Sequence, residues 1–525
     1  MHLLGIDIGT TNCKVGLFAA DGGELAIVSR PTPYRRAADG YGAYEPEGLW
    51  QTVLAALQEV LRGPEGRGEP IRAIGIASMA ETGLLLDAQT GEPRTDFVPW
   101  FDDRAREHVD TSAGGVEPVE RFRRTGLRPS FKYGLPKILW LREKERDVTD
   151  GALWLSAADY IAYRLTGVCG TDYTLAARTY GFRIDTKTWD EKLLESLGLS
   201  PALFPEAYPS GYPLGNVAGR IRQQLNLASE VTVAVSGHDH ISAALAVGAV
   251  EPGVIYDSMG TAETLIGTLP ERPLGEKEFS SGLTFGLHVV PGCMFWLGGL
   301  SSSGGSIEWM RGLLGKEPLS YQEVEAVLAE VPPGPTGIIY LPYLAGSGAP
   351  LPDQAVRGAL IGLDKRHKHG EILRAVLEGT AYEMEAIRRS AQEVGGIPID
   401  QITAVGGGTR NQIWLQLKAD ISGCEYFIPS LAEATLLGAA LTAGFGCGAL
   451  SSDDLTRIAA RQRRDGKRVV PDMERHRAYR YWYENAYTRL QNPLRDYYNT
   501  LARDARHLTC CSAGTRRAPS PGKNS

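Results

Sequence analysis

Two short segments, about half the chain length apart, repeat one design of strand, polar turn and strand. The first, HLLGIDIGTTNCKVGLF, begins at residue 2, and the second, VIYDSMGTAETLIGTL, begins at residue 254. Each has an aspartate just before a Gly-Thr turn, and apolar runs typical of strands flank that turn. Two similar hairpins, each opening one half, indicate a duplicated pair of domains that holds one ligand between its copies.

The turn of the first hairpin has the chemistry of a phosphate site. Thr10 and Thr11 offer hydroxyl and amide donors, and Lys14 adds a positive charge. Asp7 is placed to hold a hydrated Mg²⁺ ion, which typically takes one or two carboxylates together with phosphate oxygens. An ordinary hairpin with a polar tip is the alternative, and the second hairpin shifts the balance towards phosphate.

A third region, VTVAVSGHDHISAALAVGAV at 231–250, predicts a buried strand that leads into a helix. Its first five residues are an apolar run, and a small-residue helical pattern starts near Ile241. Ligands of parallel α/β sheets bind at the carboxyl ends of the strands. Asp239, which lies between strand and helix, is therefore a candidate general base, and helix capping is the alternative role.

Two further turns in the first half carry groups suited to the hydroxyls of a sugar or polyol. The segment 71–87 predicts strand, polar turn and strand, with Glu81 in the turn. The segment FVPWFDDRA ends another strand and brings Asp102 and Arg104 onto a loop. A solvated, salt-bridged turn is the alternative for both places.

The segment ITAVGGGTRNQIWLQLKADISG, 402–423, predicts strand, glycine turn and helix in the second half. Gly407 would permit close approach to a flat ring or ribose, and Asn411 can hydrogen-bond a base edge. A glycine triplet is also common in tight turns that bind nothing. Apolar periodicity predicts helices at 46–61, 131–145, 151–165 and about 475–501.

Bulk composition excludes several classes of protein. A net charge of -7 over 525 residues argues against non-specific nucleic-acid binding, which needs a basic surface. No run approaches the roughly 18 to 20 apolar residues of a membrane span. Seven scattered cysteines without zinc-ligand spacing, and an N-terminus without signal-peptide features, favour reduced thiols and a cytoplasmic location.

Together these motifs resemble the FGGY family of carbohydrate kinases, from Leu3 to about Phe445. The most specific segment, GALIGLDKRHKHGEILRAVLEG at 358–379, fits the C-terminal signature of the family. DIGTTNCK and SMGTAET resemble its two phosphate hairpins, GGGTRN its adenosine loop, and EATLLGAALTAGFG its closing helix. The helix motif KILWLREK fits less well.

The resemblance implies an α/β fold of duplicated actin-like (RNase H-like) ATPase domains with an interdomain cleft. A first domain, 1–248, would hold the acceptor sugar and the catalytic base. A second domain, 249–502, would bind the nucleotide. The tail 503–525 has a disorder-like composition and is expected to lie outside the fold.

The resemblance also implies a role for each candidate residue. Asp239 would take the proton from the substrate hydroxyl as that oxygen attacks the γ-phosphate of ATP, and Asp7 would hold Mg²⁺ through water. The matching positions are Thr10, Thr11, Lys14, Gly260 and Thr261 for the phosphates, Gly407 and Asn411 for adenosine, and Glu81, Asp102, Arg104 and His240 for the acceptor.

The sequence says less about the identity of the acceptor than about the reaction. Glu81 fits the Arg-Glu-Thr turn of glycerol kinases, but Ala80 replaces the arginine, and xylulokinases have Met-His where this chain has Met79-Ala80. His240 either binds an acceptor hydroxyl or supports Asp239. We expect an open-chain sugar or polyol, with a pentulose such as xylulose favoured over glycerol.

Two other functions remain as alternatives at this point. One is a non-catalytic, sugar-sensing relative of the kinases, and the other is an actin-like nucleotide switch that phosphorylates no sugar. The expected partner is a small molecule rather than a nucleic acid or a membrane, with a homodimer left open.

Overall fold

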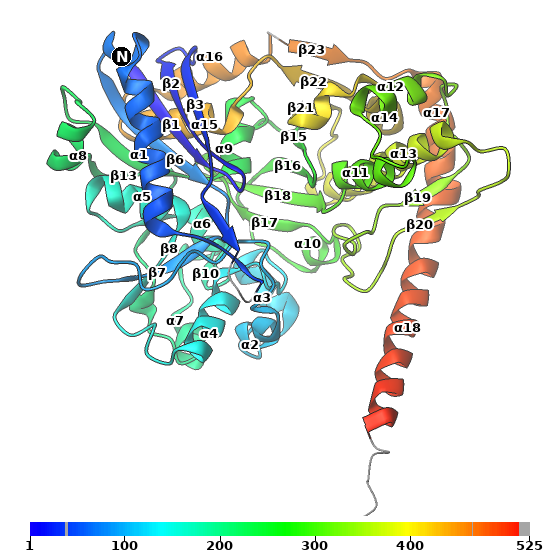
Figure 1. Cartoon of the computed structure of the whole chain (residues 1–525), viewed down its shortest axis with the longest axis horizontal. Helices are drawn as coiled ribbons and strands as arrows, with labels where there is room; N and C mark the ends of the chain where they lie inside the picture. Colours follow the sequence, from blue (N-terminus) through cyan, green and yellow to red (C-terminus); the bar gives the residue numbers. More distant parts are fainter. Residues whose placement is uncertain (37–39, 465, 514–525) are drawn as a thin grey trace, which may run out of the picture.

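A computed structural model describes residues 1–36, 40–464 and 466–513 of the chain. Two mixed sheets dominate it, and helices pack against both (Figure 1). The first sheet has the strand order β13-β14-β6-β1-β2-β3, and the second has the order β17-β18-β16-β15-β21-β22-β23. The predicted duplicated α/β architecture is confirmed.

The first sheet is built around the first hairpin. β1 pairs antiparallel with β2, and β6 and β14 continue the sheet in parallel with β1. The edge strand β13 is antiparallel to β14. The strands are β1 (His2–Ile8), β2 (Asn12–Ala19), β3 (Glu24–Pro31), β6 (Ile71–Ser78), β13 (Pro213–Asn216) and β14 (Thr232–His238).

The second sheet repeats this pattern. β15 and β16 form the hairpin, β21 and β22 run parallel to β15, and β23 is the antiparallel edge. β17 extends the other edge beyond β18. The strands are β15 (Val254–Met259), β16 (Glu263–Pro270), β17 (Thr284–Leu287), β18 (Cys293–Leu300), β21 (Gln401–Val405), β22 (Glu425–Pro429) and β23 (Gly466–Val469).

Helices and small sheets surround these two sheets. The helices are α1 (Pro46–Arg62), α2 (Val109–Ser112), α3 (Pro118–Thr125), α4 (Gly134–Lys144), α5 (Ala157–Thr166), α6 (Tyr173–Ala177), α7 (Glu191–Ser196), α8 (Gly219–Gln224), α9 (Asp239–Ala246), α10 (Glu276–Ser280), α11 (Gly304–Leu313), α12 (Tyr321–Ala329), α13 (His369–Gly395), α14 (Gln412–Ser422), α15 (Ala434–Gly446), α16 (Ser452–Gln462), α17 (Met473–Trp482) and α18 (Thr488–Ala513). The remaining strands are β4 (Tyr34–Arg36), β5 (Gly42–Tyr44), β7 (Gly83–Asp87), β8 (Ala152–Ser156), β9 (Thr171–Asp172), β10 (Phe182–Arg183), β11 (Thr188–Trp189), β12 (Ala207–Tyr208), β19 (Ile339–Leu341) and β20 (Ala359–Ile361).

Helix α15 returns from the second half of the chain to cover the first sheet, where it packs on β1, β6, β14 and α9. The contact is backbone against backbone. A side chain on Gly75 would overlap the carbonyl oxygen of Ala439, and one on Gly438 would overlap that of Ser242. Glycine is therefore required at this crossing, because no other residue lets the two elements approach so closely.

Most of the predicted elements are confirmed, but 151–165 is not a single helix. Residues 152–156 form β8, and α5 starts at Ala157. Ser156 and Asp159 form a capping box, in which each side chain accepts a hydrogen bond from the other residue's backbone amide. That box starts the helix, so the apolar residues before it are free to pair as a strand.

The C-terminal region also differs from its prediction. The predicted tail, 503–525, begins inside α18, which continues to Ala513, and the residues beyond lie outside the described part of the chain. Alanine, leucine and arginine, all good helix formers, continue the helix backbone through this segment. Among the described residues no helix has the length and apolar character needed to cross a membrane.

Candidate functional site

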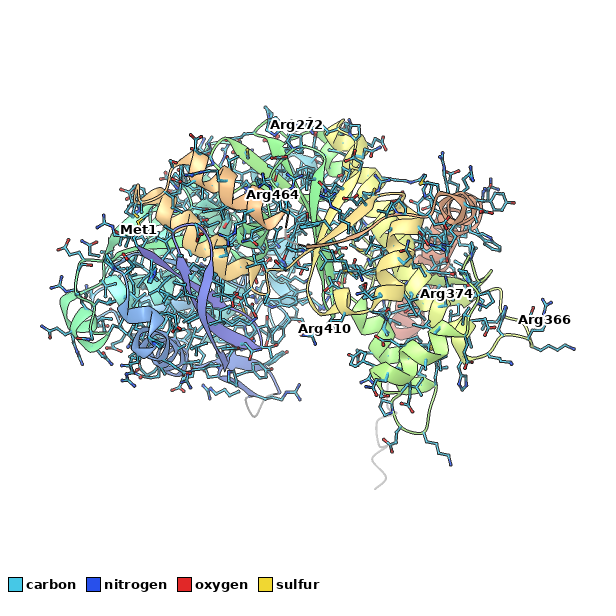
Figure 2. The ribbon with its side chains drawn as sticks, turned by 90° about the horizontal axis from the view of Figure 1, so that it is seen from above. Met1, Arg272, Arg366, Arg374, Arg410 and Arg464 are labelled. Carbon is cyan, nitrogen blue, oxygen red and sulfur yellow. The ribbon has the colours of Figure 1, made fainter. Side chains whose placement is uncertain are left out.

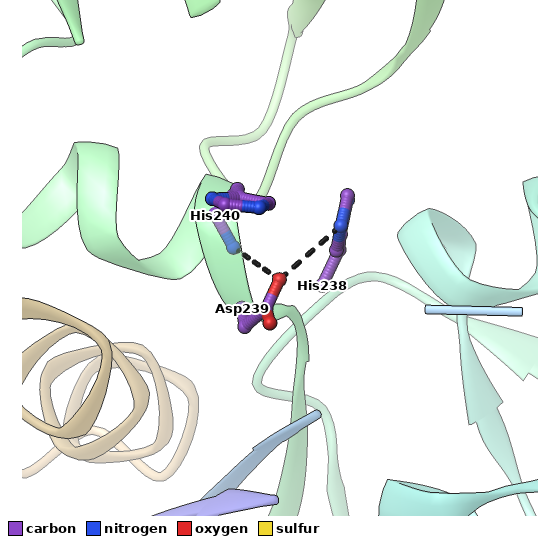
Figure 3. Close-up of side chains that lie close together, drawn as sticks. All are labelled: His238, Asp239 and His240. Atoms are coloured by element: carbon purple, nitrogen blue, oxygen red, sulfur yellow. Dashed lines mark hydrogen bonds and ion pairs between the residues drawn. The ribbon is translucent and has the colours of Figure 1, made fainter. Parts of the chain in front are cut away.

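Asp239 lies at the carboxyl end of a parallel strand, as predicted. β14 ends at His238, and α9 begins with Asp239 itself, so His238 holds the capping position. The Oδ1 atom of Asp239 accepts a hydrogen bond of 2.7 Å from the amide of His240 and lies 3.2 Å from Nε2 of His238 (Figure 3). The carboxylate is thus held at the start of the helix beside one backbone amide and one imidazole.

The electrostatics of this carboxylate suit a proton acceptor. Burial is the main cause that raises the pKa of Asp239, and the carboxylate of Glu81 adds to it, while His240 and Arg178 act in the opposite direction. Burial also holds the pKa of His238 well below its usual range, so this ring is neutral. A carboxylate with a raised pKa is a better base than an ordinary surface aspartate.

The turn that carries Glu81 is held by two cations that the sequence analysis did not single out. Lys137, on α4, donates from Nζ to the carbonyl oxygen of Glu81 at 2.6 Å. Arg178 donates from Nε to Oε1 of Glu81 at 2.6 Å and makes a second bond to the same oxygen from Nη2. The guanidinium carbon of Arg178 lies 5.2 Å from the ring centre of Tyr133. Glu81 has a left-handed backbone, φ 62°, which this network holds.

Asp102 and Arg104 are paired with each other. Nε and Nη2 of Arg104 donate to the two carboxylate oxygens of Asp102 at 2.7 and 2.6 Å, and Nη2 also donates to the carbonyl of Gly42. Their side chains are 3% and 10% exposed, respectively. This geometry favours the salt-bridged turn over direct contact with an acceptor.

Trp100 connects the acceptor turn to the first phosphate hairpin. Its indole Nε1 donates to Oγ1 of Thr10 at 2.9 Å, and its amide donates to Oγ1 of Thr82 at 3.1 Å. The ammonium of Lys132 lies 5.2 Å from the centre of the Trp100 ring. The two sites that the sequence analysis treated separately are therefore adjacent.

Asp7 and Lys14 face each other across the first hairpin. Lys14 donates from Nζ to Oε2 of Glu433 at 2.7 Å, whereas Oδ1 of Asp7 is buried and has no hydrogen-bond partner among the described residues. Burial, the largest cause, and the carboxylates of Asp239 and Glu433 together raise the pKa of Asp7 to about 8, while Lys14 acts in the opposite direction. A buried carboxylate oxygen without a partner, near two other carboxylates, favours a cation.

The second hairpin lies beside the start of α11 and beside the predicted glycine loop. The exposed residues Gly260 and Thr261 accept hydrogen bonds through their carbonyls from the amides of Gly304 and Gly305, at the start of α11. A side chain on Gly406 would overlap Met259, so the glycine triplet packs against the same hairpin. The hairpin, the start of α11 and the glycine loop therefore lie together.

The glycine loop leads directly into α14. Oδ1 of Asn411 accepts from the amide of Trp414 at 3.0 Å and so caps this helix, which leaves the side-chain NH₂ group as the donor for a ligand. Gly407 is exposed. Arg410, the neighbour of Asn411, lies near the middle of the molecule when it is viewed from above (Figure 2).

The two halves meet around Asp239. The ring of Tyr256, on β15, has its centre 6.4 Å from that of His240, and Oγ1 of Thr435 donates to the backbone carbonyl of Asp239 at 3.5 Å. Lys14 and Glu433 join the halves a short distance away. Candidate base, first phosphate hairpin and acceptor turn therefore lie at one junction.

A second cluster of charges lies under the second hairpin. Lys418, on α14, bonds Glu263 and lies 4.0 Å from Oδ2 of Asp257, while Ser303 donates to the other oxygen of Glu263. Burial, together with Glu263, raises the pKa of Asp257 well above its usual range. This cluster is sealed in the core.

Two sheets of the same topology, each with a hairpin of this kind, form the duplicated arrangement of the actin-like ATPase fold. The same fold is present in the gluconate kinase from Lactobacillus acidophilus, with a TM-score of 0.86 at 23% identity over 95% of this chain and 99% of that one. It is also present in the Plasmodium falciparum glycerol kinase with ADP, with a TM-score of 0.81 at 22% identity over 91% and 95%.

Two family models together match most of the chain. The N-terminal domain of the FGGY family of carbohydrate kinases matches residues 2–246, and its C-terminal domain matches residues 255–447. The protein therefore belongs to the FGGY family of carbohydrate kinases.

Characterised relatives have different acceptors. The chain is 31% identical to a glycerol kinase of Gloeobacter violaceus, over 85% of this chain and 88% of the relative. It is 27% identical to a xylulose kinase of Bacillus subtilis, over 93% and 97%. The predicted class of enzyme, an ATP-using carbohydrate kinase with a sugar or polyol substrate, is confirmed. The homodimer and the cytoplasmic location stay predictions.

Proposed function

We propose that the protein transfers the γ-phosphate of ATP to one hydroxyl of an open-chain sugar or polyol, with Asp239 as general base. The observation that carries this proposal is the place of Asp239, at the carboxyl end of β14 between the acceptor turn and the first phosphate hairpin. A partly buried carboxylate with a raised pKa accepts a proton readily as a hydroxyl oxygen becomes a nucleophile.

The surrounding residues position and tune this base. The amide of His240 fixes one oxygen of Asp239 by its hydrogen bond, and the neutral ring of His238 stays within 3.2 Å of that oxygen without adding charge. Arg178 neutralises Glu81 and so limits the repulsion between the two carboxylates. Trp100, which lies between the acceptor turn and the hairpin, offers an apolar ring to the carbon chain of the acceptor.

The residues present fit Mg²⁺ and ATP. The unpartnered oxygen of Asp7 suits a hydrated Mg²⁺ ion, and Lys14, Thr10 and Thr11 offer donors and charge to phosphates. Gly260 and Thr261 would meet the phosphates from the other half, with Gly407 and Asn411 at the adenosine. Bound Mg²⁺-ATP supplies the phosphoryl group and neutralises charge on it.

Among neutral acceptors we place a pentulose such as xylulose first and glycerol second. Ala80 leaves the acceptor turn without the arginine of glycerol kinases, and Arg178 brings a guanidinium to the same turn from another element. His240 lies near Asp239, where it can support the base or bind an acceptor hydroxyl. A sugar sensor without turnover is the second candidate function.

The replacement Asp239→Asn tests the base. It should lower kcat by about 10²- to 10⁴-fold, the usual contribution of general base catalysis, while ATP binding persists. Asp257→Asn is the matched control, because Asp257 is also buried with a raised pKa but lies in the sealed cluster. Turnover of Asp239→Asn close to that of the unaltered protein would contradict the assignment.

A screen for ADP release identifies the acceptor class. We expect activity on at least one member of a panel of ketoses, aldoses, alditols and polyhydroxy acids. Binding of an acceptor and of ATP without any ADP release would instead favour the sensor.

A further inference from the structure

The cationic side chains around the acceptor turn differ in whether they are hydrogen-bonded to an oxygen of the protein. Most of them are bonded to an oxygen of the protein, and these bonds leave little capacity for a ligand. The bonded cations are Arg178 with Glu81, Arg104 with Asp102, and Lys137 with the backbone carbonyl of Glu81. Lys132 is the exception: among the described residues its ammonium has no hydrogen-bond acceptor and no carboxylate within ion-pair distance, only the face of Trp100.

Lys132 is nevertheless part of the site. It precedes Tyr133, whose ring stacks with the Arg178 guanidinium, on the loop that leads into α4. Its ammonium lies over Trp100, the residue that bonds Thr10 of the phosphate hairpin. The fields of Glu81 and Arg178 both reach it. The ammonium thus lies between the acceptor turn and the hairpin.

This arrangement leaves the ammonium partly desolvated but still accessible to a ligand. Lys132 is partly buried, and burial is the main cause that lowers its pKa. An ammonium has three donors and no acceptor, so loss of hydration without a partner oxygen is unfavourable. Contact with the Trp100 ring compensates only in part. The missing partner is an oxygen that a bound acceptor would bring.

We propose that Lys132 binds a carboxylate of the acceptor, so that the preferred substrates are open-chain polyhydroxy acids rather than neutral polyols. This inference rests on the proposed function. A carboxylate forms charge-assisted hydrogen bonds with an ammonium, about twice as strong as those of a hydroxyl. Arg178 already neutralises Glu81, so the turn does not repel a second carboxylate strongly.

The test compares acceptors that differ in one group only. Xylonate and xylitol share chain length and hydroxyl configuration, as do erythronate and erythritol, but the acids have a carboxylate in place of one terminal CH₂OH. We expect kcat/KM to be about tenfold to a hundredfold higher for each acid, as a hydrogen bond to a charged group predicts.

Lys132→Met should abolish that preference. The variant should lower kcat/KM for the acids by about tenfold to a hundredfold and change the values for the alcohols less than threefold. Lys132→Arg should retain part of the preference. Lys144→Met is the matched control, because Lys144 also lies over a tryptophan ring, that of Trp140, but on the exposed surface.

Titration calorimetry with xylonate and xylitol, on the unaltered protein and on Lys132→Met, separates this inference from the proposed function. Equal turnover of acid and alcohol, or an equal loss of both in a Lys132→Met protein that melts normally, would overturn the carboxylate site and leave the kinase intact. Xylonate binding that depends on Lys132, without turnover of any acceptor, would uphold the carboxylate site and overturn the kinase.

Discussion

The two hairpins occupy the same place in two sheets of the same topology, yet the charged side chains around them differ in burial. At the first hairpin, the side chains of Lys14 and of its partner from the other half, Glu433, are each 25% exposed, and one oxygen of Asp7 has no hydrogen-bond partner among the described residues. At the second hairpin, Lys418, Glu263 and Asp257 are at most 1% exposed; Lys418 bonds Glu263, and the oxygens of Asp257 have no hydrogen-bond partner among the described residues. Burial, rather than topology, decides which charges are available for chemistry.

The comparison extends to two buried lysines. Lys418 has a carboxylate partner, whereas Lys137 has only backbone carbonyls, and burial lowers the pKa of Lys137 to about 7. A cation beside a fixed carboxylate is a structural element. Lys137, by contrast, loses its proton near neutral pH and holds the acceptor turn by hydrogen bonds while adding little charge.

The largest effect should come from Lys418→Met. This change leaves Glu263 buried without its cation, and loss of one partner of a buried pair costs about 3–5 kcal/mol of stability. Urea unfolding measures the difference. The double replacement Lys418→Met with Glu263→Gln should recover much of the loss; a single variant as stable as the unaltered protein would show that the cluster is not an ion pair.

A smaller, pH-dependent effect is expected at Lys137. Its folded pKa, about 7, is below the unfolded value of about 10.4. Its contribution to stability is therefore fully present above pH 10.4 and is lost as pH falls towards 7, by about 1.4 kcal/mol per unit. Unfolding of the protein and of Lys137→Met at pH 7 and pH 9 measures it.

The sign of that effect is the test. The stability of the unaltered protein relative to Lys137→Met should rise between pH 7 and pH 9. An unchanged difference would mean that the lysine keeps its proton in the folded state, and the contrast with Lys418 would then disappear.

The smallest effect should come from the pair that joins the two halves. Because Lys14 and Glu433 are part-exposed, a double-mutant cycle with Lys14→Met and Glu433→Gln should give a coupling of about 0–1 kcal/mol in urea unfolding. Lys14→Met should still weaken ATP binding, by about tenfold, since it removes a charge-assisted bond. A coupling above 3 kcal/mol would place this pair with the buried cluster.

What the sequence could predict was local. The hairpins, the strand before Asp239 and the helix at 46–61 each follow from periodicity and turn residues within one short window. The boundary between β8 and α5 had a local signal too, because Ser156 and Asp159 have the spacing of a capping box. The run of apolar residues around them suggested one helix instead.

The partners of the site residues could not be predicted in this way. Arg178 reaches Glu81, and Glu433 reaches Lys14, from distant parts of the chain, and no periodicity connects them. Lys132 is unusual because its ammonium has no oxygen partner among the described residues, and the absence of a partner cannot be predicted from a sequence. The closed pair of Asp102 and Arg104 likewise depends on Gly42.

Helix α15 has a consequence for how the protein can be dissected. Its backbone lies on the first sheet at Gly75 and against α9 at Gly438, although its residues come long after the end of the first half in the sequence. A fragment that stops at residue 248 would leave that glycine-lined face uncovered. We expect such a fragment to aggregate and to regain solubility when a separate polypeptide that contains 434–446 is expressed with it. The segment that the N-terminal family model matches, 2–246, is therefore not the segment that folds as a unit, because the first sheet also needs α15.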